Sequence, residues 1–191
     1  MTFTVTMTTL PKFLPRYCEV YQDAIPANVC KLLIEQFEYS DNKQRLDDRG
    51  YPTFTQVNIN QEYPTMVPPL VMYVKDVVQR YHRDYPEYTK YIPVLRSLEE
   101  FRVKRYNENS EDRFDEHVDV ADIQSANRQL AFLFYLNGNF DGGQTQFNDG
   151  SRVTPNTGSV LVFPPFWLFP HAGLPVTKGT KYIMSTYIHL A

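Results

Sequence analysis

The residues best suited to metal chemistry are two histidines and an aspartate in the second half of the chain. His117 is followed two positions later by Asp119, and side chains at i and i+2 of a β-strand point to the same face. An imidazole and a carboxylate therefore converge, and His171 from a distant strand is the natural third ligand. Two histidines and one carboxylate leave coordination positions open, as non-haem Fe(II) oxygenases require. The sequence thus predicts a site for one metal ion.

A lysine ten residues after His171 adds to this prediction. Lys181 opens the alternating segment Lys181–Leu190, in which the odd-numbered positions share one strand face. That face carries a cation, a hydroxyl, a phenol and an imidazole, namely Lys181, Ser185, Tyr187 and His189. Such a set lines a polar pocket better than a dry core. Taken alone, Lys181 would read as a surface lysine at a strand edge.

The elements that must position these residues are mostly strands after about residue 95. Residues 101–104 alternate between apolar and basic side chains, which indicates a half-buried strand, and Gln129–Leu136 is apolar enough to be buried on both faces. Further strands are expected at 144–147, 159–163 and 181–190. Because turn residues separate these short strands, we predict a mainly β fold with a jelly-roll, double-stranded β-helix core that is cupin-like.

Two amphipathic helices are expected before residue 95. The first runs over Pro26–Tyr39, and the second runs from Pro68 to about Arg83. Their apolar faces are Val29, Leu32, Leu33 and Phe37 in the first, and Leu70, Val74, Val77, Val78 and Tyr81 in the second. Both faces are expected to cover a sheet, with His82 solvated.

The rest of the first half is expected to be irregular or weakly extended. Residues 41–50 read as a polar loop, and Thr53–Ile59 reads as a weak strand. The whole chain, 1–191, is therefore expected to form one domain. In this division 1–95 is a helical support region and 96–191 is the jelly-roll catalytic core.

Composition and charge exclude several classes of protein. With 191 residues, a net charge of −3 and 42% hydrophobic residues, the chain is a folded globule without a strong nucleic-acid signal. No apolar run reaches the roughly 18 residues of a membrane span, and Met1–Leu10 lacks the features of a signal peptide. We therefore expect a soluble, intracellular, cytoplasmic protein that does not bind membranes. Cys18 and Cys30 are expected to be reduced.

Several segments together resemble the Fe(II)- and 2-oxoglutarate-dependent dioxygenases, specifically the prolyl 4-hydroxylase branch. The resemblance covers roughly Glu99–Leu190, about half of the chain. The matching segments, which occur in the family's order, are His117–Asp119, Arg128 with the strand that ends at Tyr135-Leu136-Asn137, Gly142–Phe147 and His171–Tyr182. The resemblance implies the double-stranded β-helix fold already predicted from the strand pattern.

The resemblance also implies roles for particular residues. His117, Asp119 and His171 would bind Fe(II), and Lys181 would pair with the distal carboxylate of 2-oxoglutarate. A charge-assisted hydrogen bond of that kind contributes about 1.5–3 kcal/mol. Tyr106 and Tyr135 match tyrosines that line the co-substrate pocket, although either could equally be a core residue. Lys178, in a Thr-Lys-Gly turn, is the weaker alternative to Lys181.

On the substrate side, the resemblance assigns channel positions to Glu99, Arg128 and His189. Tyr187 stands where the branch usually has a tryptophan, and Phe114 replaces a tyrosine three residues before His117. The serine-rich segment that grips peptide in this branch has no counterpart at Asp47–Thr55. Arg128 and Tyr135 are seven residues apart and would face opposite ways on one regular strand, so Arg128 is expected to precede the strand.

The function implied is hydroxylation of an unactivated C–H bond with Fe(II), 2-oxoglutarate and O2, and possible use of ascorbate as a reductant. The first substrate expected is proline in a peptide or protein. The alternatives are the same chemistry on a free amino acid, another small molecule or a nucleobase, and a non-catalytic jelly-roll binding module. The polar segments Asn107–Arg113 and Val120–Asn127 flank the first two ligands and are candidate lids.

Overall fold

The computed structural model describes residues 14–47, 52–91, 97–108 and 111–190. The helices are α1 (Ala27–Tyr39), α2 (Ile59–Glu62) and α3 (Val67–Asp84), with 3-10 turns η1 (Pro64–Met66) and η2 (Pro86–Tyr88). The first seven strands are β1 (Glu19–Tyr21), β2 (Gln44–Asp47), β3 (Thr53–Asn58), β4 (Arg102–Asn107), β5 (Phe114–His117), β6 (Arg128–Tyr135) and β7 (Asp141–Gly142). The others are β8 (Thr145–Phe147), β9 (Arg152–Val153), β10 (Val160–Phe163), β11 (His171–Gly173), β12 (Val176–Lys178) and β13 (Thr180–His189).

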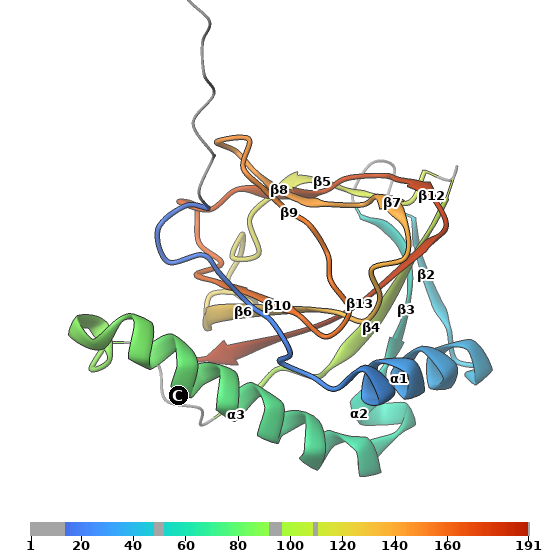
Figure 1. Cartoon of the computed structure of the whole chain (residues 1–191), viewed down its shortest axis with the longest axis horizontal. Helices are drawn as coiled ribbons and strands as arrows, with labels where there is room; N and C mark the ends of the chain where they lie inside the picture. The colour runs from blue at the N-terminus through green and yellow to red at the C-terminus, as the bar shows by residue number, and fades with distance from the viewer. Residues whose placement is uncertain (1–13, 48–51, 92–96, 109–110, 191) are drawn as a thin grey trace, which may run out of the picture.

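The strands form two facing antiparallel sheets, which confirms the predicted double-stranded β-helix. The larger sheet has seven strands in the order β1-β10-β6-β13-β4-β3-β2, and the smaller has four in the order β5-β11-β8-β9. A two-stranded ribbon, β12-β7, joins them at one end. Figure 1 shows the smaller sheet above the larger one, with α1 and α3 beneath the larger sheet. The inner faces of the two sheets therefore face each other across the space that holds the candidate site.

The helices cover the outer face of the larger sheet, as the amphipathic patterns predict. In α3 the buried residues are the five expected from the sequence: Leu70, Val74, Val77, Val78 and Tyr81. In α1 the expected face is partly wrong, because Leu32 is 42% exposed while Cys30, Leu33 and Phe37 are buried. Leu32 and Leu33 are about 100° apart around the helix, and the tightly packed face includes Leu33.

Between the sheets lies a second core, which strand β6, apolar from Leu130 to Tyr135, divides from the first. Phe132 and Phe134 face the helices, whereas Leu133 and Tyr135 face the smaller sheet. Burial on both faces explains why β6 lacks the usual alternation with polar residues. The prediction for this strand is confirmed, and its inward-facing residues form the floor beneath the candidate site.

Residues before 95 contribute more to the sheet than expected. β1, β2 and β3 all belong to the larger sheet, so the description of 1–95 as helical is incomplete. The predicted loop at 41–50 contains β2, a polar strand in which only Leu46 is partly buried. His82 is also not freely solvated, since its Nε2 is buried without a hydrogen-bond partner among the described residues. The proposed division near residue 95 falls in 92–96, outside the described residues.

Two further features bear on the sequence-based expectations. Cys18 and Cys30 are buried and unpaired, which confirms that they form no disulfide with each other. Among the described residues, no helix combines the length and the apolar character needed to cross a membrane. The segment Met1–Leu10 lies outside the described residues.

Candidate active site

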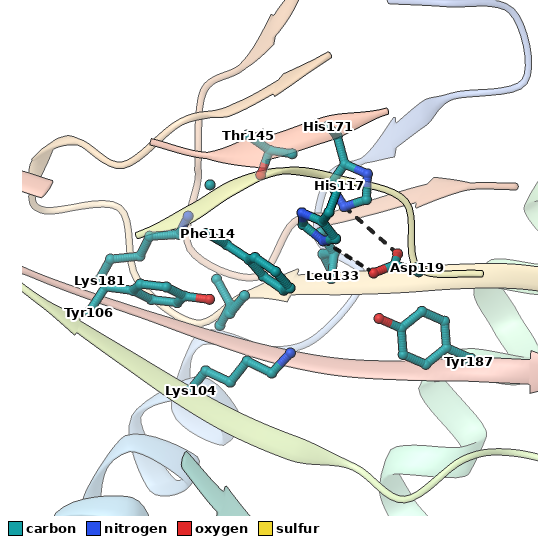
Figure 2. Close-up of a pocket in the computed structure, with 12 residues that line it drawn as sticks. Lys104, Tyr106, Phe114, His117, Asp119, Leu133, Thr145, His171, Lys181 and Tyr187 are labelled. Carbon is teal, nitrogen blue, oxygen red and sulfur yellow. Dashed lines mark ion pairs between the residues drawn. The ribbon is translucent and has the colours of Figure 1, made fainter. Parts of the chain in front are cut away.

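The three predicted ligands meet between the sheets, where β5 and β11 run side by side. His171 on β11 is the direct register partner of His117 on β5. Asp119 lies 3.4 Å from His117 Nε2 through Oδ1 and 3.7 Å from His171 Nε2 through Oδ2. All three ligand atoms lie within 4.8 Å of one another, and Figure 2 shows the side chains converging. This spacing suits three donors around one metal ion.

The route by which Asp119 reaches the site differs from the prediction. β5 ends at His117, so strand alternation does not place the carboxylate. Instead, the turn after β5 is anchored by Val120 N–H, which donates to Pro165 O (3.1 Å), and by Arg128 Nη1, which donates to Asp119 O (2.8 Å). His171, expected on a strand distant in sequence from His117, is the first residue of β11.

Both imidazoles are held in the tautomer that a metal ligand needs. His117 Nδ1 lies 2.7 Å from Asp115 O, and His171 Nδ1 lies 3.1 Å from Phe169 O. A carbonyl oxygen can only accept, so each Nδ1 carries the hydrogen and each Nε2 keeps its lone pair. Burial lowers the pKa of His171, which keeps that ring neutral. Both Nε2 lone pairs are therefore available for coordination.

Asp119 completes a donor set that fits a divalent cation such as Fe(II). Burial opposes ionisation, but the nearby His117, His171 and Lys104 together lower the pKa of Asp119 to about 2. Its Oδ2 is buried and has no hydrogen-bond partner among the described residues. A buried, ionised oxygen without a partner is costly unless a cation neutralises it. Fe(II) would satisfy that oxygen and both imidazoles.

Lys181 lies in the same cavity as the triad, as expected. It is only 2% exposed, and its Nζ donates to Gly143 O at 2.6 Å. Burial, together with the charge of Lys104, lowers its pKa to about 7. By contrast, Lys178 is exposed on β12. The buried lysine is therefore the one placed to meet a carboxylate inside the sandwich.

The two predicted co-substrate tyrosines lie beside Lys181. The Tyr106 and Tyr135 ring centroids are 5.2 and 6.0 Å from Lys181 Nζ. Burial raises the pKa of both phenols, so each keeps its proton. Tyr106 lines the cavity, whereas the Tyr135 hydroxyl lies 2.8 Å from Thr145 Oγ1, and it is Thr145 that lines it. From the sequence, Thr145 was indicated only by its place in the matching segment Gly142–Phe147.

The four predicted substrate-side residues form one connected network. Glu99 accepts two hydrogen bonds from Arg128, at 2.7 and 2.8 Å, and lies 3.0 Å from His189 Nε2. Burial opposes ionisation of Glu99, but these contacts outweigh it and lower its pKa. The Arg128 guanidinium lies 4.1 Å from the centroid of the Tyr187 ring. The network borders two cavities of about 360 and 340 Å³ that both adjoin Asp119.

Arg128 is the first residue of β6 rather than a residue before it. A register irregularity between Ile188 and His189 sets Arg128 opposite His189. A bulge interrupts the alternation of side chains at that point. Arg128 and Tyr135 can therefore both point toward the space between the sheets, although they are seven residues apart on one strand. The expected conflict of strand faces is thereby removed.

The two candidate lids differ in how they are held. In 120–127, the Ser125 hydroxyl donates to the Asp122 carboxylate at 2.7 Å, and this turn borders the 340 Å³ cavity. In 107–113, the buried Asp112 pairs with Arg45 at 2.6 Å, and residues 109 and 110 lie outside the described residues. A lid role for either segment stays a prediction.

Two residues at the centre of the site had no role assigned from the sequence: Phe114 was noted only as a replacement for a tyrosine, and Lys104 only as part of a strand. Phe114 stacks on His117, with ring centroids 3.5 Å apart and planes 9° apart. Lys104, expected on the polar side of a half-buried strand, instead lines the cavity that contains the triad. The basic side of that strand faces the space between the sheets, not solvent. The only indication in the sequence was that Lys104 and Tyr106, two residues apart, share one face of the predicted strand.

The fold and the side chains together define a double-stranded β-helix protein with a two-histidine, one-carboxylate metal site. Comparison with known proteins agrees, because residues 101–189 match the family model of the 2OG-Fe(II) oxygenase superfamily. This region, a little under half of the chain, is thus similar to that superfamily, and the curated relatives are similar to it in the same region.

Two curated relatives carry prolyl 4-hydroxylase names. One, from Acanthamoeba polyphaga mimivirus, is 34% identical over 93 residues, which are 43% of this chain and 38% of the relative. The other, prolyl 4-hydroxylase 9 of Arabidopsis thaliana, is 30% identical over 120 residues, covering 47% of this chain and 40% of the relative. This chain thus spans about two fifths of the length of these relatives.

Solved prolyl hydroxylases share the fold at low sequence identity. The Trichoplax adhaerens enzyme, in complex with a hypoxia-inducible factor peptide, has a TM-score of 0.73 at 15% identity and covers 91% of this chain and 83% of its own. The viral collagen prolyl hydroxylase of Paramecium bursaria Chlorella virus-1, in complex with 2-oxoglutarate, has a TM-score of 0.65 at 21% identity, covering 92% and 97%. These likenesses confirm the architecture of nearly the whole chain.

Proposed function

We propose that this chain is a 2-oxoglutarate-dependent dioxygenase that hydroxylates an unactivated C–H bond. One observation carries the proposal: a single cavity is lined by His117, Asp119 and His171 on one side and by Lys181 on the other. A metal-binding jelly roll with another purpose has no need for a buried cation facing the metal. The match of residues 101–189 to the superfamily model supports the same proposal.

In this proposal the triad holds Fe(II), which supplies oxygen activation coupled to decarboxylation of 2-oxoglutarate. The neutral imidazoles and the ionised Asp119 donate three ligand atoms and leave the remaining positions open. Phe114 stacks flat on His117 and restricts rotation of that ring. Phe114 and Leu133 also line the cavity and limit the access of water to it.

Lys181 would receive the distal carboxylate of the co-substrate by exchanging one hydrogen-bond partner. Its ammonium now donates to Gly143 O, and a carboxylate is the stronger acceptor. The protonated Tyr106 hydroxyl borders the same cavity and can donate to the same ligand. The cavity is about 30 Å³, room for roughly one water molecule. The side chains around it must therefore move apart when 2-oxoglutarate enters.

Proline in a peptide or protein is the proposed substrate. The support is the names of the two curated relatives and the peptide complex of the Trichoplax adhaerens enzyme. The wider cavity of about 360 Å³ beside the triad offers a place for the residue to be hydroxylated. Glu99, Arg128, Tyr187 and His189 would orient it there.

The test is succinate release by the purified chain with Fe(II), 2-oxoglutarate and O2, with and without ascorbate. We expect succinate only when metal is present, and a proline-containing peptide should raise its rate and gain the mass of one oxygen atom. Asp119→Ala should abolish release, and Lys178→Ala should not. Absence of metal-dependent succinate would refute the dioxygenase proposal. Succinate without any modified proline peptide would refute only the substrate.

A further inference from the structure

Two lysines enter the candidate active site, and 2-oxoglutarate accounts for only one of them. Lys104 and Lys181 line the same cavity (Figure 2). Lys181 Nζ donates to Gly143 O, and Lys104 Nζ lies 5.0 Å from the centroid of the Phe54 ring. Within the described part of the chain, neither lysine has a carboxylate within 4.0 Å. Unpaired cations at a partly buried site call for anions.

Lys104 occupies the boundary between the metal site and the outer cavity. It lines both the cavity that contains the triad and the adjoining one of about 360 Å³. On β4 it shares a strand face with Tyr106, which lies deeper, and Arg102, which lies farther out. In Figure 2 its side chain lies below the other lining residues and extends toward the side where Tyr187 lies. A substrate in the outer cavity would therefore meet Lys104 beside His117 and Asp119, which line both cavities as well.

The other charges at the outer cavity already compensate each other. Glu99 pairs with Arg128 at 2.7 Å, and Glu100 pairs with Arg102 at 3.2 Å. In the loaded site that the proposed function requires, a divalent metal, a dianionic 2-oxoglutarate, Asp119 and Lys181 sum to zero. Lys104 then remains as one uncompensated positive charge beside the reacting carbon.

We infer that the substrate presents a carboxylate that binds Lys104, close to the carbon that is hydroxylated. This inference rests on the proposed function and narrows its substrate class to anionic molecules. The carboxylate has two possible sources: a terminal carboxylate, as in a free or carboxy-terminal amino acid, or an acidic side chain next to the target residue. Burial lowers the pKa of Lys104 to about 8, which leaves it protonated at neutral pH. A neutral substrate would bury that charge without a partner.

Binding to the chain loaded with Mn(II) and the inert analogue N-oxalylglycine tests this directly by calorimetry. The first probe pair is N-acetyl-L-proline and its amide, which differ in one charge. The second is acetyl-Pro-Glu-amide and acetyl-Pro-Gln-amide. In one pair the acid should bind about 10- to 100-fold more tightly than its neutral partner, the range of one charge-assisted hydrogen bond. The pair that shows the preference identifies the source of the carboxylate.

Variants of Lys104 complete the design. Lys104→Met should abolish the preference while leaving the neutral probe's affinity unchanged, and Lys104→Arg should retain it. Lys178→Met, at an exposed lysine on β12, is the matched control and should change nothing. Thermal melts of all variants verify folding, and Lys104→Gln replaces Lys104→Met if the latter does not fold.

Three results would overturn the inference. The first is equal binding within both probe pairs, and the second is a charge preference that survives in Lys104→Met. The third is a loss of N-oxalylglycine affinity in Lys104→Met as large as in Lys181→Met, which would assign Lys104 to the co-substrate. If N-oxalylglycine itself fails to bind the metal-loaded chain, the proposed function falls together with the inference. Normal analogue binding without a charge preference removes only the inference.

Discussion

His117 and His171 are direct partners across the β5–β11 pair, with ring centroids 4.4 Å apart. Two antiparallel strands of the smaller sheet therefore fix the spacing of two metal ligands before any metal binds. Only Asp119 comes from a turn. The backbone contact that orients that turn is then part of the metal site, although it donates no ligand.

Loss of the carboxylate ligand should weaken metal binding strongly. Asp119→Asn keeps the size of the side chain but removes the charge that the cation needs. Because altering a residue that merely supports a ligand costs about 10–100-fold in metal affinity, loss of a ligand should cost more than about 100-fold. Titration of the chain with Mn(II), followed by electron paramagnetic resonance, measures this. Wild-type affinity in Asp119→Asn would show that the metal binds elsewhere.

Substitution of Arg128 should weaken metal binding, and substitution of His189 should not. Both contact Glu99, but only Arg128 also donates to Asp119 O. Arg128→Met should therefore weaken Mn(II) binding by about 10-fold or more, whereas His189→Ala should leave it nearly unchanged. Both should slow substrate hydroxylation in the proposed reaction. Equal metal affinities in the two variants would contradict the positioning role of Arg128.

Lys181→Ala should raise the KM for 2-oxoglutarate and leave metal affinity unchanged. The variant would leave the distal carboxylate without a cation in a site that water solvates poorly, at a cost of about 2–4 kcal/mol, or roughly 30- to 1,000-fold. Lys178→Ala is the matched control because that lysine is exposed. Succinate release across a 2-oxoglutarate titration decides the matter. A normal KM in Lys181→Ala, or a large effect in Lys178→Ala, would count against the assignment.

Binding of 2-oxoglutarate should depend on pH through Lys181. Burial and the charge of Lys104 lower its pKa to about 7, and only the protonated form attracts a carboxylate. Above pH 7 binding must take up a proton, so affinity should fall by up to about 10-fold per pH unit. Calorimetry in two buffers with different ionisation enthalpies measures that uptake. Lys181→Arg, which stays charged, should flatten the profile, and a flat wild-type profile would argue against proton uptake.

The orientation of α1 can be tested with two neighbouring leucines. Leu33 is fully buried against the larger sheet, whereas Leu32 is 42% exposed. Leu33→Ala should lower the free energy of unfolding by about 2–5 kcal/mol, and Leu32→Ala should lower it by less than about 1 kcal/mol. Urea denaturation monitored by circular dichroism compares them. Similar losses in the two variants would support the apolar face expected from the sequence, which includes both leucines, and the reverse order would contradict the orientation of α1.

The sequence predicted best where one physical signal was strong and local. The stripe of α3 follows helical spacing with five buried residues, and β6 is apolar on both faces, so both were identifiable. β2 was missed because its four residues are nearly all polar and only Leu46 is partly buried. Its pairing with β3 stabilises it, and pairing is not visible in a single segment.

In the candidate site, too, the sequence predicted the features that depend on residue type and order, but not those that depend on tertiary contacts. The ligands and Lys181 were found because their types and order are distinctive. Lys104 was assigned to a polar face because alternation tells which residues share a face but not what that face meets. The anchoring of Asp119 by Arg128 depends on a bulge between Ile188 and His189. No spacing rule in the sequence indicates such a bulge.

The pairing of β1 with β10 has a consequence for handling the protein. The three residues Glu19–Tyr21 pair with Val160–Val162 of β10, a strand whose four side chains are fully buried. A chain shortened to begin after Tyr21 would expose a row of unsatisfied amides and carbonyls on an apolar strand, which another copy could extend. Solubility and shelf life would then decline with concentration, although every residue around the metal remained in place.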